Sequence, residues 1–317
     1  MRIVVLDGAA ANPGDIDWSA FEKFGEVIVY DVTPPELLVE RAKDCEIAIT
    51  NKTAFTADVI EQLPSLKYIG VLATGYNVID LEAAREHGIV VTNVPEYSTF
   101  ATMQHTIALM LELTNCVAIH NEAVKEGRWI TSTQFCFWDR SLTEIWNKTI
   151  AVVGYGKIGR RVAATCKALG ARVVVVPHKM PSSNEDGVTY LSFEEACKEA
   201  DIITFHCPLT AETKNLVNAS SIKTMKDGVL IINAARGPLV NEQDMREALE
   251  AGKVGGYAAD VISVEPMLKD NPLLGAPNCI LTPHTAWAPK ETRIRLVEAA
   301  ADNIQAFIDC KPINVVN

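Results

Sequence analysis

The sequence predicts an α/β protein with two doubly wound parallel-sheet domains, and three observations carry this prediction. Short apolar runs alternate with helical segments through the first hundred residues. The same alternation resumes after residue 149 and continues to a final helical segment. A β-branched run at 149–153 leads straight into a glycine-rich turn and a helix. Strands that alternate with helices form βαβ units, whose sheets are parallel and covered on both faces.

The expected elements follow from apolar runs and capping residues. In the first part, Pro34 opens a helix, Thr56 caps a second and Asp80 caps a third. In the second part, Ser192 and Glu195 form a capping box and Asn241 caps another helix. A final amphipathic helix is expected over 290–308. The expected strands are 3–6, 27–30, 47–50, 68–72, 89–92, 149–153, 173–176, 202–206, 229–233, 256–260 and 279–282.

Composition limits the class of protein. The 317 residues suggest about two domains. The net charge of −11 argues against nucleic acid or an anionic membrane as partner. No apolar run reaches the roughly 18 residues of a membrane span, and the N-terminus lacks a signal-peptide pattern. Eight cysteines without a CxxC pair favour reduced thiols over disulfides or a metal site. A cytoplasmic protein is therefore expected.

A long helix and an aromatic loop lie between the two alternating parts. The helix is expected to run without interruption from Thr99 or Thr102 to Val124. The loop at 129–146 then carries five aromatic residues, Trp129, Phe135, Phe137, Trp138 and Trp146. Such surfaces more often pack or contact a partner than do chemistry. We expect the helix and loop to form a homodimer surface.

The glycine-rich turn GYGKIG at 154–159 predicts a dinucleotide site. Gly154 permits a tight turn, Gly156 lets a pyrophosphate approach and Gly159 lets the helix pack against the sheet. The N–H groups of Lys157 and Ile158, together with the helix dipole, would face the phosphates.

Three polar residues follow three consecutive strands of the second part. They are Arg236, Glu265 and His284. Singly, each has an ordinary explanation: a surface ion pair, a turn before proline, or a histidine in the core. Together, at the sheet edge where ligands bind, they suit the reduction of a 2-oxo acid. An Arg fork grips a carboxylate, His⁺ protonates the carbonyl oxygen, and a buried carboxylate orients and charges that His.

These segments resemble the D-isomer-specific 2-hydroxyacid dehydrogenase family over nearly the whole chain. Residues 73–77 and 135–139 are further similar to glycerate dehydrogenases, also called hydroxypyruvate reductases. The family motifs are LATGYN at 72–77, QHTIAL at 104–109, GYGKIG at 154–159, HCPLT at 206–210, NAARG at 233–237, Glu265-Pro266 and Pro283-His284.

The resemblance implies a domain arrangement and residue roles. A Rossmann cofactor domain at 99–287 would be inserted into a flavodoxin-like substrate domain formed by 1–98 and 288–317. Arg236 would bind the substrate carboxylate, His284 would be the acid/base and Glu265 its partner. The implied substrate-binding residues are Lys52, Ala73, Thr74, Gly75 and Arg236. Lys52 is also explained as a solvated surface lysine.

The implied cofactor is NAD, with NADP or dual use open. NAD-preferring members carry an Asp at the end of the second Rossmann strand, where this chain has Pro177, followed by His178-Lys179 and later Ser182-Ser183. Without that carboxylate a 2′-phosphate is not repelled. Asp260 would accept from the nicotinamide amide. The implied contact positions are Thr74, Gly154, Gly156, Lys157, Ile158, Gly159, His178, Cys207, Pro208, Ala234, Ala235, Arg236, Asp260, His284 and Ala286.

The sequence thus predicts an oxidoreductase that reduces hydroxypyruvate, and glyoxylate, to the D-2-hydroxy acid. One alternative is a dehydrogenase for another 2-oxo acid, of the lactate, phosphoglycerate or branched type. The other is a dinucleotide-sensing binding protein similar to the family's corepressors, which can keep the three polar residues.

Overall fold

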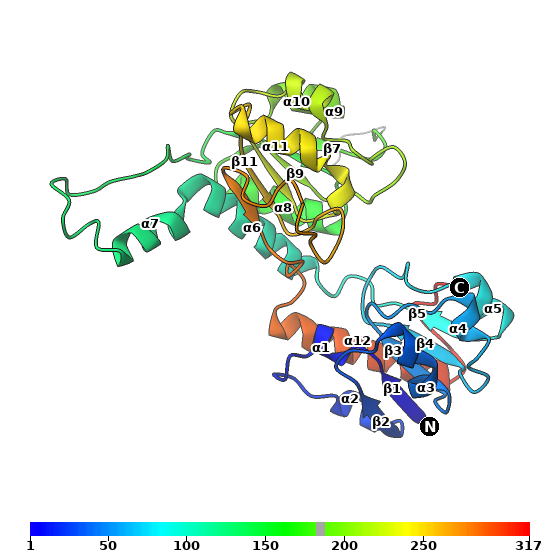
Figure 1. The fold of residues 1–317 in the computed structure, drawn as a ribbon. Coiled ribbons are helices and arrows are strands. Elements are labelled where there is room, and N and C mark those ends of the chain that lie inside the picture. The colour runs from blue at the N-terminus through cyan, green and yellow to red at the C-terminus, as the bar shows by residue number, and fades with distance from the viewer. Residues whose placement is uncertain (182–187) are drawn as a thin grey trace. The chain divides into compact units, whose positions relative to one another are not determined.

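The computed structural model describes residues 1–181 and 188–317. The chain divides into two compact units (Figure 1). One combines Met1–Ser98 with Trp287–Asn317, and the other is the continuous segment Thr99–Ala286. Both units contain a parallel sheet between helices, as the sequence predicts. Among the described residues, no helix is long and apolar enough to cross a membrane.

The first unit is built on a five-stranded parallel sheet in the order β2-β1-β3-β4-β5. This is the strand order of flavodoxin-like folds. Alternate residues of β1 and of the position after it enter opposite cores: Ile3 and Val5 pack on one face, and Val4 and Leu6 on the other. The strands are β1 (Arg2–Val5), β2 (Glu26–Val29), β3 (Ile47–Thr50), β4 (Tyr68–Val71) and β5 (Val90–Thr92).

The helices of this unit are short, apart from the last. Asp80 accepts a hydrogen bond from the Ala83 N–H and caps its helix as predicted. Thr56 is the N-cap residue of its helix, as predicted, but its side chain makes no capping hydrogen bond in the described residues. The elements are α1 (Gly8–Ala11), α2 (Ser19–Glu22), η1 (Pro35–Leu37), α3 (Leu38–Ala42), α4 (Ala57–Ile60), α5 (Leu81–Glu86) and α12 (Lys290–Ile308). The helix α12 closes one core with residues such as Leu296, Ala300 and Ile304.

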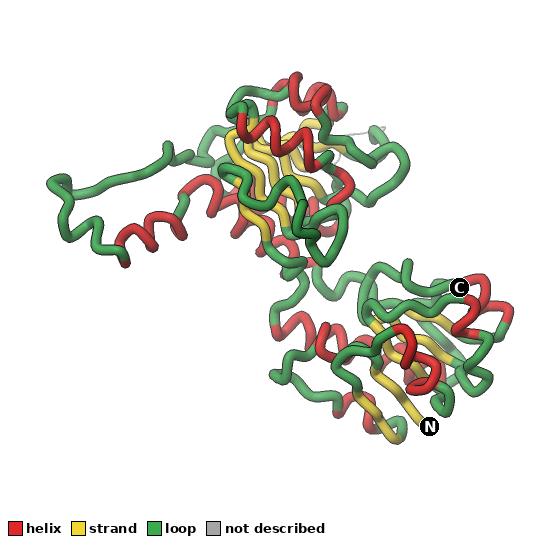
Figure 2. The backbone as a smooth tube through the Cα atoms, viewed as in Figure 1, coloured by secondary structure: helices red, strands yellow, loops and turns green. Residues whose placement is uncertain are grey.

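The second unit holds a seven-stranded parallel sheet in the order β12-β11-β10-β9-β6-β7-β8. Strand order reverses between β6 and β9, which creates the crevice where open α/β sheets bind ligands. Apolar cores cover both faces of this sheet. Helices flank its strands (Figure 2). The strands are β6 (Thr149–Val153), β7 (Arg172–Val176), β8 (Thr189–Tyr190), β9 (Ile202–Phe205), β10 (Val229–Asn233), β11 (Val254–Ala259) and β12 (Cys279–Leu281).

Capping residues set the helices of the second unit. Ser192 and Glu195 make both bonds of the predicted capping box, and Asn241 accepts two N–H bonds at its helix. The sequence analysis did not anticipate β8 or α10. The helices are α6 (Thr99–Asn115), α7 (Val117–Lys125), α8 (Lys157–Ala168), α9 (Phe193–Glu199), α10 (Ala219–Thr224), η2 (Gly237–Leu239) and α11 (Glu242–Glu250).

The long helix expected to reach Val124 is interrupted at Cys116, which has φ +51°. In an uninterrupted helix, the Thr114 carbonyl would accept from the Ala118 N–H. Here that carbonyl accepts from the Thr143 N–H at 2.9 Å, and a Glu112 side-chain oxygen takes the Ala118 N–H at 3.0 Å. The returning loop therefore ends α6 and redirects the chain into α7.

The helix α7 and the loop after it project from the rest of their unit as an arm, residues 117–146 (Figure 1). Arg128 makes a bidentate pair with Asp139 at 2.6 and 2.8 Å, which ties the loop together. Several large apolar side chains of the arm are exposed, and Ile130 and Phe135 are each 87% exposed. The arm is thus an ordered structure that leaves large apolar side chains uncovered.

Candidate active site

The glycine turn has the geometry that a dinucleotide needs. Gly154 has φ +93°, and a Cβ there would lie 2.6 Å from the Cys207 nitrogen. A Cβ on Gly159 would lie 2.1 Å from the Gly154 oxygen, so α8 approaches the turn as closely as glycine allows. A Cβ on Gly156 would meet nothing within 4 Å. The turn and the N-terminus of α8 therefore fit a pyrophosphate, with open space at the one glycine that must face it.

The residues after β9 form the other wall of this crevice. The His206 N–H donates to the Val153 oxygen at 2.7 Å, joining the end of β9 to the end of β6. The His206 ring pairs with the Thr204 hydroxyl at 2.9 Å, while its Nδ1 is buried without a partner in the described part of the chain. Burial lowers the pKa of His206 to about 3, so the ring is neutral. Burial also raises the pKa of the Cys207 thiol.

Arg236 is positioned by a turn that Asn233 braces. Asn233 ends β10 fully buried, and its amide both donates to the Arg236 oxygen at 2.9 Å and accepts from the Ala235 N–H at 3.1 Å. The Arg236 guanidinium is exposed and donates to the Ala235 oxygen at 2.7 Å. A Cβ on Gly237 would lie 1.9 Å from the Ile262 carbonyl carbon. The Arg236 segment therefore touches the segment that leads to Glu265.

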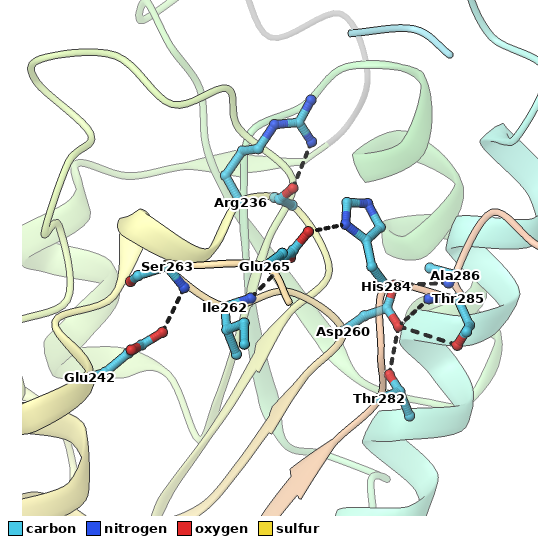
Figure 3. Close-up of polar contacts among 11 residues, drawn as sticks. Arg236, Glu242, Asp260, Ile262, Ser263, Glu265, Thr282, His284, Thr285 and Ala286 are labelled. Atoms are coloured by element: carbon cyan, nitrogen blue, oxygen red, sulfur yellow. Dashed lines mark hydrogen bonds and ion pairs between the residues drawn. The ribbon is translucent and has the colours of Figure 1, made fainter. Parts of the chain in front are cut away.

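The Glu265 segment is held from α11. The first residue of that helix, Glu242, accepts from the Ser263 N–H at 2.7 Å and from the Asn271 amide at 2.9 Å. The Glu265 carboxylate accepts from the Ile262 N–H at 3.2 Å. The peptide bond from Glu265 to Pro266 is cis. These contacts fix the direction of the Glu265 side chain (Figure 3).

His284 and Glu265 form a close pair. The His284 Nδ1 lies 2.6 Å from a Glu265 carboxylate oxygen, so Nδ1 carries the donated proton. The other ring nitrogen, Nε2, makes no hydrogen bond within residues 1–181 and 188–317. The sequence analysis expected a buried carboxylate here, but the Glu265 side chain is 35% exposed. The pair thus leaves Nε2 without a hydrogen-bond partner among the described residues.

Asp260 clamps the turn that carries His284. One carboxylate oxygen accepts from the Thr282 hydroxyl at 2.6 Å and the Thr285 N–H at 2.8 Å, and the other accepts from the Ala286 N–H at 2.8 Å (Figure 3). Burial would raise the pKa of Asp260, but bonds from His105, Thr282 and these amides hold it below its usual value. Asp260 is 1% exposed. Its predicted bond to a nicotinamide amide stays a prediction.

Loops of the first unit carry the substrate-binding positions expected there. Asp7, at the end of β1, accepts from the N–H groups of Asn51, Lys52 and Thr53 at 2.6–2.9 Å. The Lys52 side chain is exposed. In the described part of the chain, the N–H groups of Ala73, Thr74 and Gly75 make no hydrogen bond. Three successive free amides after β4 could bind a carboxylate.

The remaining predicted cofactor positions lie around the glycine turn and the neighbouring strand ends. Pro177 is half-buried at the end of β7, and His178 and Lys179 are exposed. Ser182 and Ser183 lie outside the described residues. Within the described residues, no group of His, Cys, Asp and Glu could hold a metal ion. Four further residues that no sequence pattern predicted brace the site: Asn233, Glu242, Thr282 and His105.

Comparisons with known proteins connect this geometry to a family. Residues 107–286 match the model for the NAD binding domain of D-isomer specific 2-hydroxyacid dehydrogenases. The chain is 46% identical over 321 residues to a hydroxypyruvate reductase from Blautia hydrogenotrophica, covering 100% of both chains. It is 40% identical over 287 residues to a glycerate dehydrogenase from Methylorubrum extorquens, covering 89% of this chain and 88% of the relative. The structure of TT0316 from Thermus thermophilus matches with a TM-score of 0.87, 33% identity and full coverage of both.

Proposed function

Because this chain belongs to the D-isomer-specific 2-hydroxyacid dehydrogenase family, whose nicotinamide dinucleotide-binding domain it carries, we propose that it reduces hydroxypyruvate to D-glycerate. Glyoxylate is the second proposed substrate, with glycolate as product. The observation that carries the proposal is the 2.6 Å His284–Glu265 pair at neighbouring strand ends of the sheet that also presents Arg236. The name of the 46% identical relative supports hydroxypyruvate over other 2-oxo acids.

The side chains divide the work of the reaction. The Arg236 fork binds the substrate carboxylate by two parallel bonds and orients the neighbouring carbonyl. When bound, the nicotinamide supplies the hydride that adds to C2. His284 gives the proton on Nε2 to the carbonyl oxygen and regains one from water after product release. Glu265 accepts the Nδ1 proton, which fixes the direction of the ring.

The first unit supplies further proposed contacts. The free N–H groups of Ala73, Thr74 and Gly75 would bind the substrate carboxylate, and Thr74 would also contact the cofactor. The Thr74 hydroxyl donates to the Val94 oxygen, and the Thr74 carbonyl accepts from the Asn93 side-chain amide. These two hydrogen bonds hold the loop in shape. Lys52 would reach the substrate from the loop that Asp7 organises.

The proposed cofactor is NAD, and the glycine turn supports a dinucleotide in either form. Pro177 brings no carboxylate to the end of β7, while His178 and Lys179 are exposed beside it. These residues would tolerate a 2′-phosphate, so NADP is the second cofactor to test. Initial rates with hydroxypyruvate, measured in parallel with NADH and NADPH, test both the substrate and the choice of cofactor. No turnover with either cofactor, while another 2-oxo acid is reduced, would contradict hydroxypyruvate as substrate.

Replacing His284 tests the proposed chemistry directly. His284→Ala removes the proton donor but leaves the glycine turn, so turnover should fall by a factor of about 10² to 10⁴. NADH binding, measured by fluorescence titration, should stay within about twofold of the unchanged protein. A His284→Ala protein with the original rate would overturn the assignment.

We also propose a cytoplasmic homodimer. All eight cysteines are free thiols, as a reducing compartment favours. The exposed apolar side chains of the arm would be covered by a second copy of the chain.

A further inference from the structure

A second histidine–carboxylate pair lies behind the His284–Glu265 pair. His105, on α6, places its Nε2 2.9 Å from the Thr282 hydroxyl and 3.3 Å from an Asp260 carboxylate oxygen. The residues are far apart in sequence: His105 and Thr282 differ by 177 positions. The helix α6 packs against β11, the strand that Asp260 follows, and this brings them together.

The direction of each hydrogen bond follows from donor counting. The Asp260 carboxylate can only accept, so the Thr282 hydroxyl gives its single proton to Asp260 at 2.6 Å. The Thr282 oxygen must then accept from His105, which requires a proton on the His105 Nε2. The chain therefore runs from His105 Nε2–H to the Thr282 hydroxyl and on to the Asp260 carboxylate.

This chain of hydrogen bonds ends at the Asp260 carboxylate, which shapes the turn that carries His284. The Asp260 carboxylate accepts from the amides of Thr285 and Ala286, directly after His284. The His284 N–H itself donates to the Asp260 carbonyl at 2.9 Å and to the Thr282 carbonyl at 3.0 Å. His284 has φ +54°, a conformation that a residue with a side chain adopts only where its surroundings enforce it.

We propose that His105 is a positioning residue for proton transfer, acting through Thr282 and Asp260 to hold the turn that directs His284 toward Glu265. This inference deepens the proposed function, since it rests on His284 as the proton donor. Without the His105 donor, the Thr282 oxygen loses its partner and its hydroxyl can rotate away from Asp260. The turn then samples orientations in which His284 no longer faces Glu265, and fewer complexes are ready for proton transfer.

Two pairs of variants test this chain of hydrogen bonds. His105→Leu and Thr282→Val each remove the hydrogen bond between His105 and Thr282. Each should lower kcat by about tenfold, which corresponds to the free energy of roughly one hydrogen bond. His105→Gln keeps an N–H that can reach Thr282, and Thr282→Ser keeps the hydroxyl. Both conservative variants should stay within about threefold of the original kcat. NADH affinity, measured by fluorescence titration, should be unchanged in all four.

The double variant shows whether His105 and Thr282 act through the same chain of hydrogen bonds or affect kcat independently. If both residues act through Asp260, His105→Leu with Thr282→Val should lower kcat no further than the larger single loss. Independent effects would multiply to about a hundredfold loss. Thr106→Val is the matched control, because within the described residues this buried hydroxyl of α6 bonds only to the Thr102 oxygen of its own helix. It should leave kcat unchanged.

Proton NMR of the protein without substrate or cofactor gives a readout independent of turnover. The His284 Nδ1 proton in its 2.6 Å bond should resonate far downfield, and its shift in Glu265→Gln assigns it. The signal should be lost in His105→Leu and retained in His105→Gln and Thr106→Val. An unchanged signal and kcat in His105→Leu would overturn the inference. Failure of the unsubstituted protein to reduce any 2-oxo acid would instead overturn the proposed function.

Discussion

Arg236 offers a clean test of carboxylate recognition at the level of single residues. Its guanidinium is exposed and, among the described residues, bonds only to the Ala235 oxygen, so substitution leaves the buried Asn233 brace intact. Arg236→Lys keeps the charge but loses the two-pronged fork, and Arg236→Ala loses both. We expect kcat/KM for hydroxypyruvate to fall by about tenfold or more in the Lys variant and further in the Ala variant. Equal values for Arg236→Lys and the unsubstituted protein would show that charge alone suffices.

His206 predicts how stability depends on pH. Its pKa falls from 6.5 to about 3 on folding, so the unfolded chain binds a proton between these values that the folded protein does not. Stability from this group is therefore present above pH 6.5 and is lost as pH falls toward 3. His206→Gln cannot titrate. Between pH 7.5 and 5.5, the unfolding free energy of the unsubstituted protein should drop by about 1.4 kcal/mol more than that of His206→Gln. Denaturant unfolding measures this difference, and parallel losses would contradict the prediction.

The positions of individual site residues were predictable from sequence only where the residues follow a strand closely. Arg236 and His284 each come three positions after a strand ends, so the parallel sheet alone predicts that they lie near one edge. The brace from His105 to Thr282 has no such signal, because it joins α6 to a turn formed much later in the chain. The exposure of Glu265 was also missed, because it depends on how the 262–271 loop packs against α11.

At the level of elements, we expect the two glycines at the junction of β6 and α8 to have different roles: Gly159 is needed for folding and Gly156 for dinucleotide binding. Gly159→Ala would place a Cβ 2.1 Å from the Gly154 oxygen and push α8 away from the sheet. Its unfolding free energy should fall by about 1–3 kcal/mol. Gly156→Ala meets no protein atom within 4 Å and has an extended backbone at φ −77°, so its stability should change by less than about 0.5 kcal/mol.

The same Gly156→Ala variant should bind NADH at least about tenfold more weakly, because its methyl group enters the space proposed for the pyrophosphate. Calorimetric titration of the two glycine variants, with thermal unfolding as the companion measurement, separates the two requirements. Undiminished NADH affinity in Gly156→Ala would place the phosphates elsewhere.

Most elements were predictable within a residue or two, because β-branched runs and capping residues are local signals. Ser192, Asp80 and Asn241 cap helices whose first residues were predicted correctly from the sequence. The break at Cys116 was not predictable, since the carbonyl that would continue α6 is taken by Thr143, 29 positions away from Thr114. The strand β8 has only two residues, too few for a pattern to appear.

At the level of the whole molecule, the exposed apolar residues of the arm favour the proposed homodimer, which substitutions in the arm should convert to a monomer. Ile130 and Phe135 are each 87% exposed and would be covered in the proposed homodimer. Replacing both with Ser should convert the dimer to a monomer at micromolar concentration, as measured by light scattering after size exclusion. Val32→Ser, at an apolar residue 68% exposed in the other unit, is the control and should leave the dimer intact. A monomeric unsubstituted protein would contradict the proposal.

The discontinuous first unit has a consequence for synthesis on the ribosome. Its sheet forms from residues that are made before the second unit, but its core is closed by α12, and the Asn317 side chain bonds to the backbone of Ile89 and Val91. The second unit is one continuous segment, so it can fold as soon as it has left the exit tunnel. One apolar face of the first sheet therefore stays uncovered until residues 287–317 emerge. Chaperones that hold nascent chains should act longest on residues 1–98, although these are translated before the second unit.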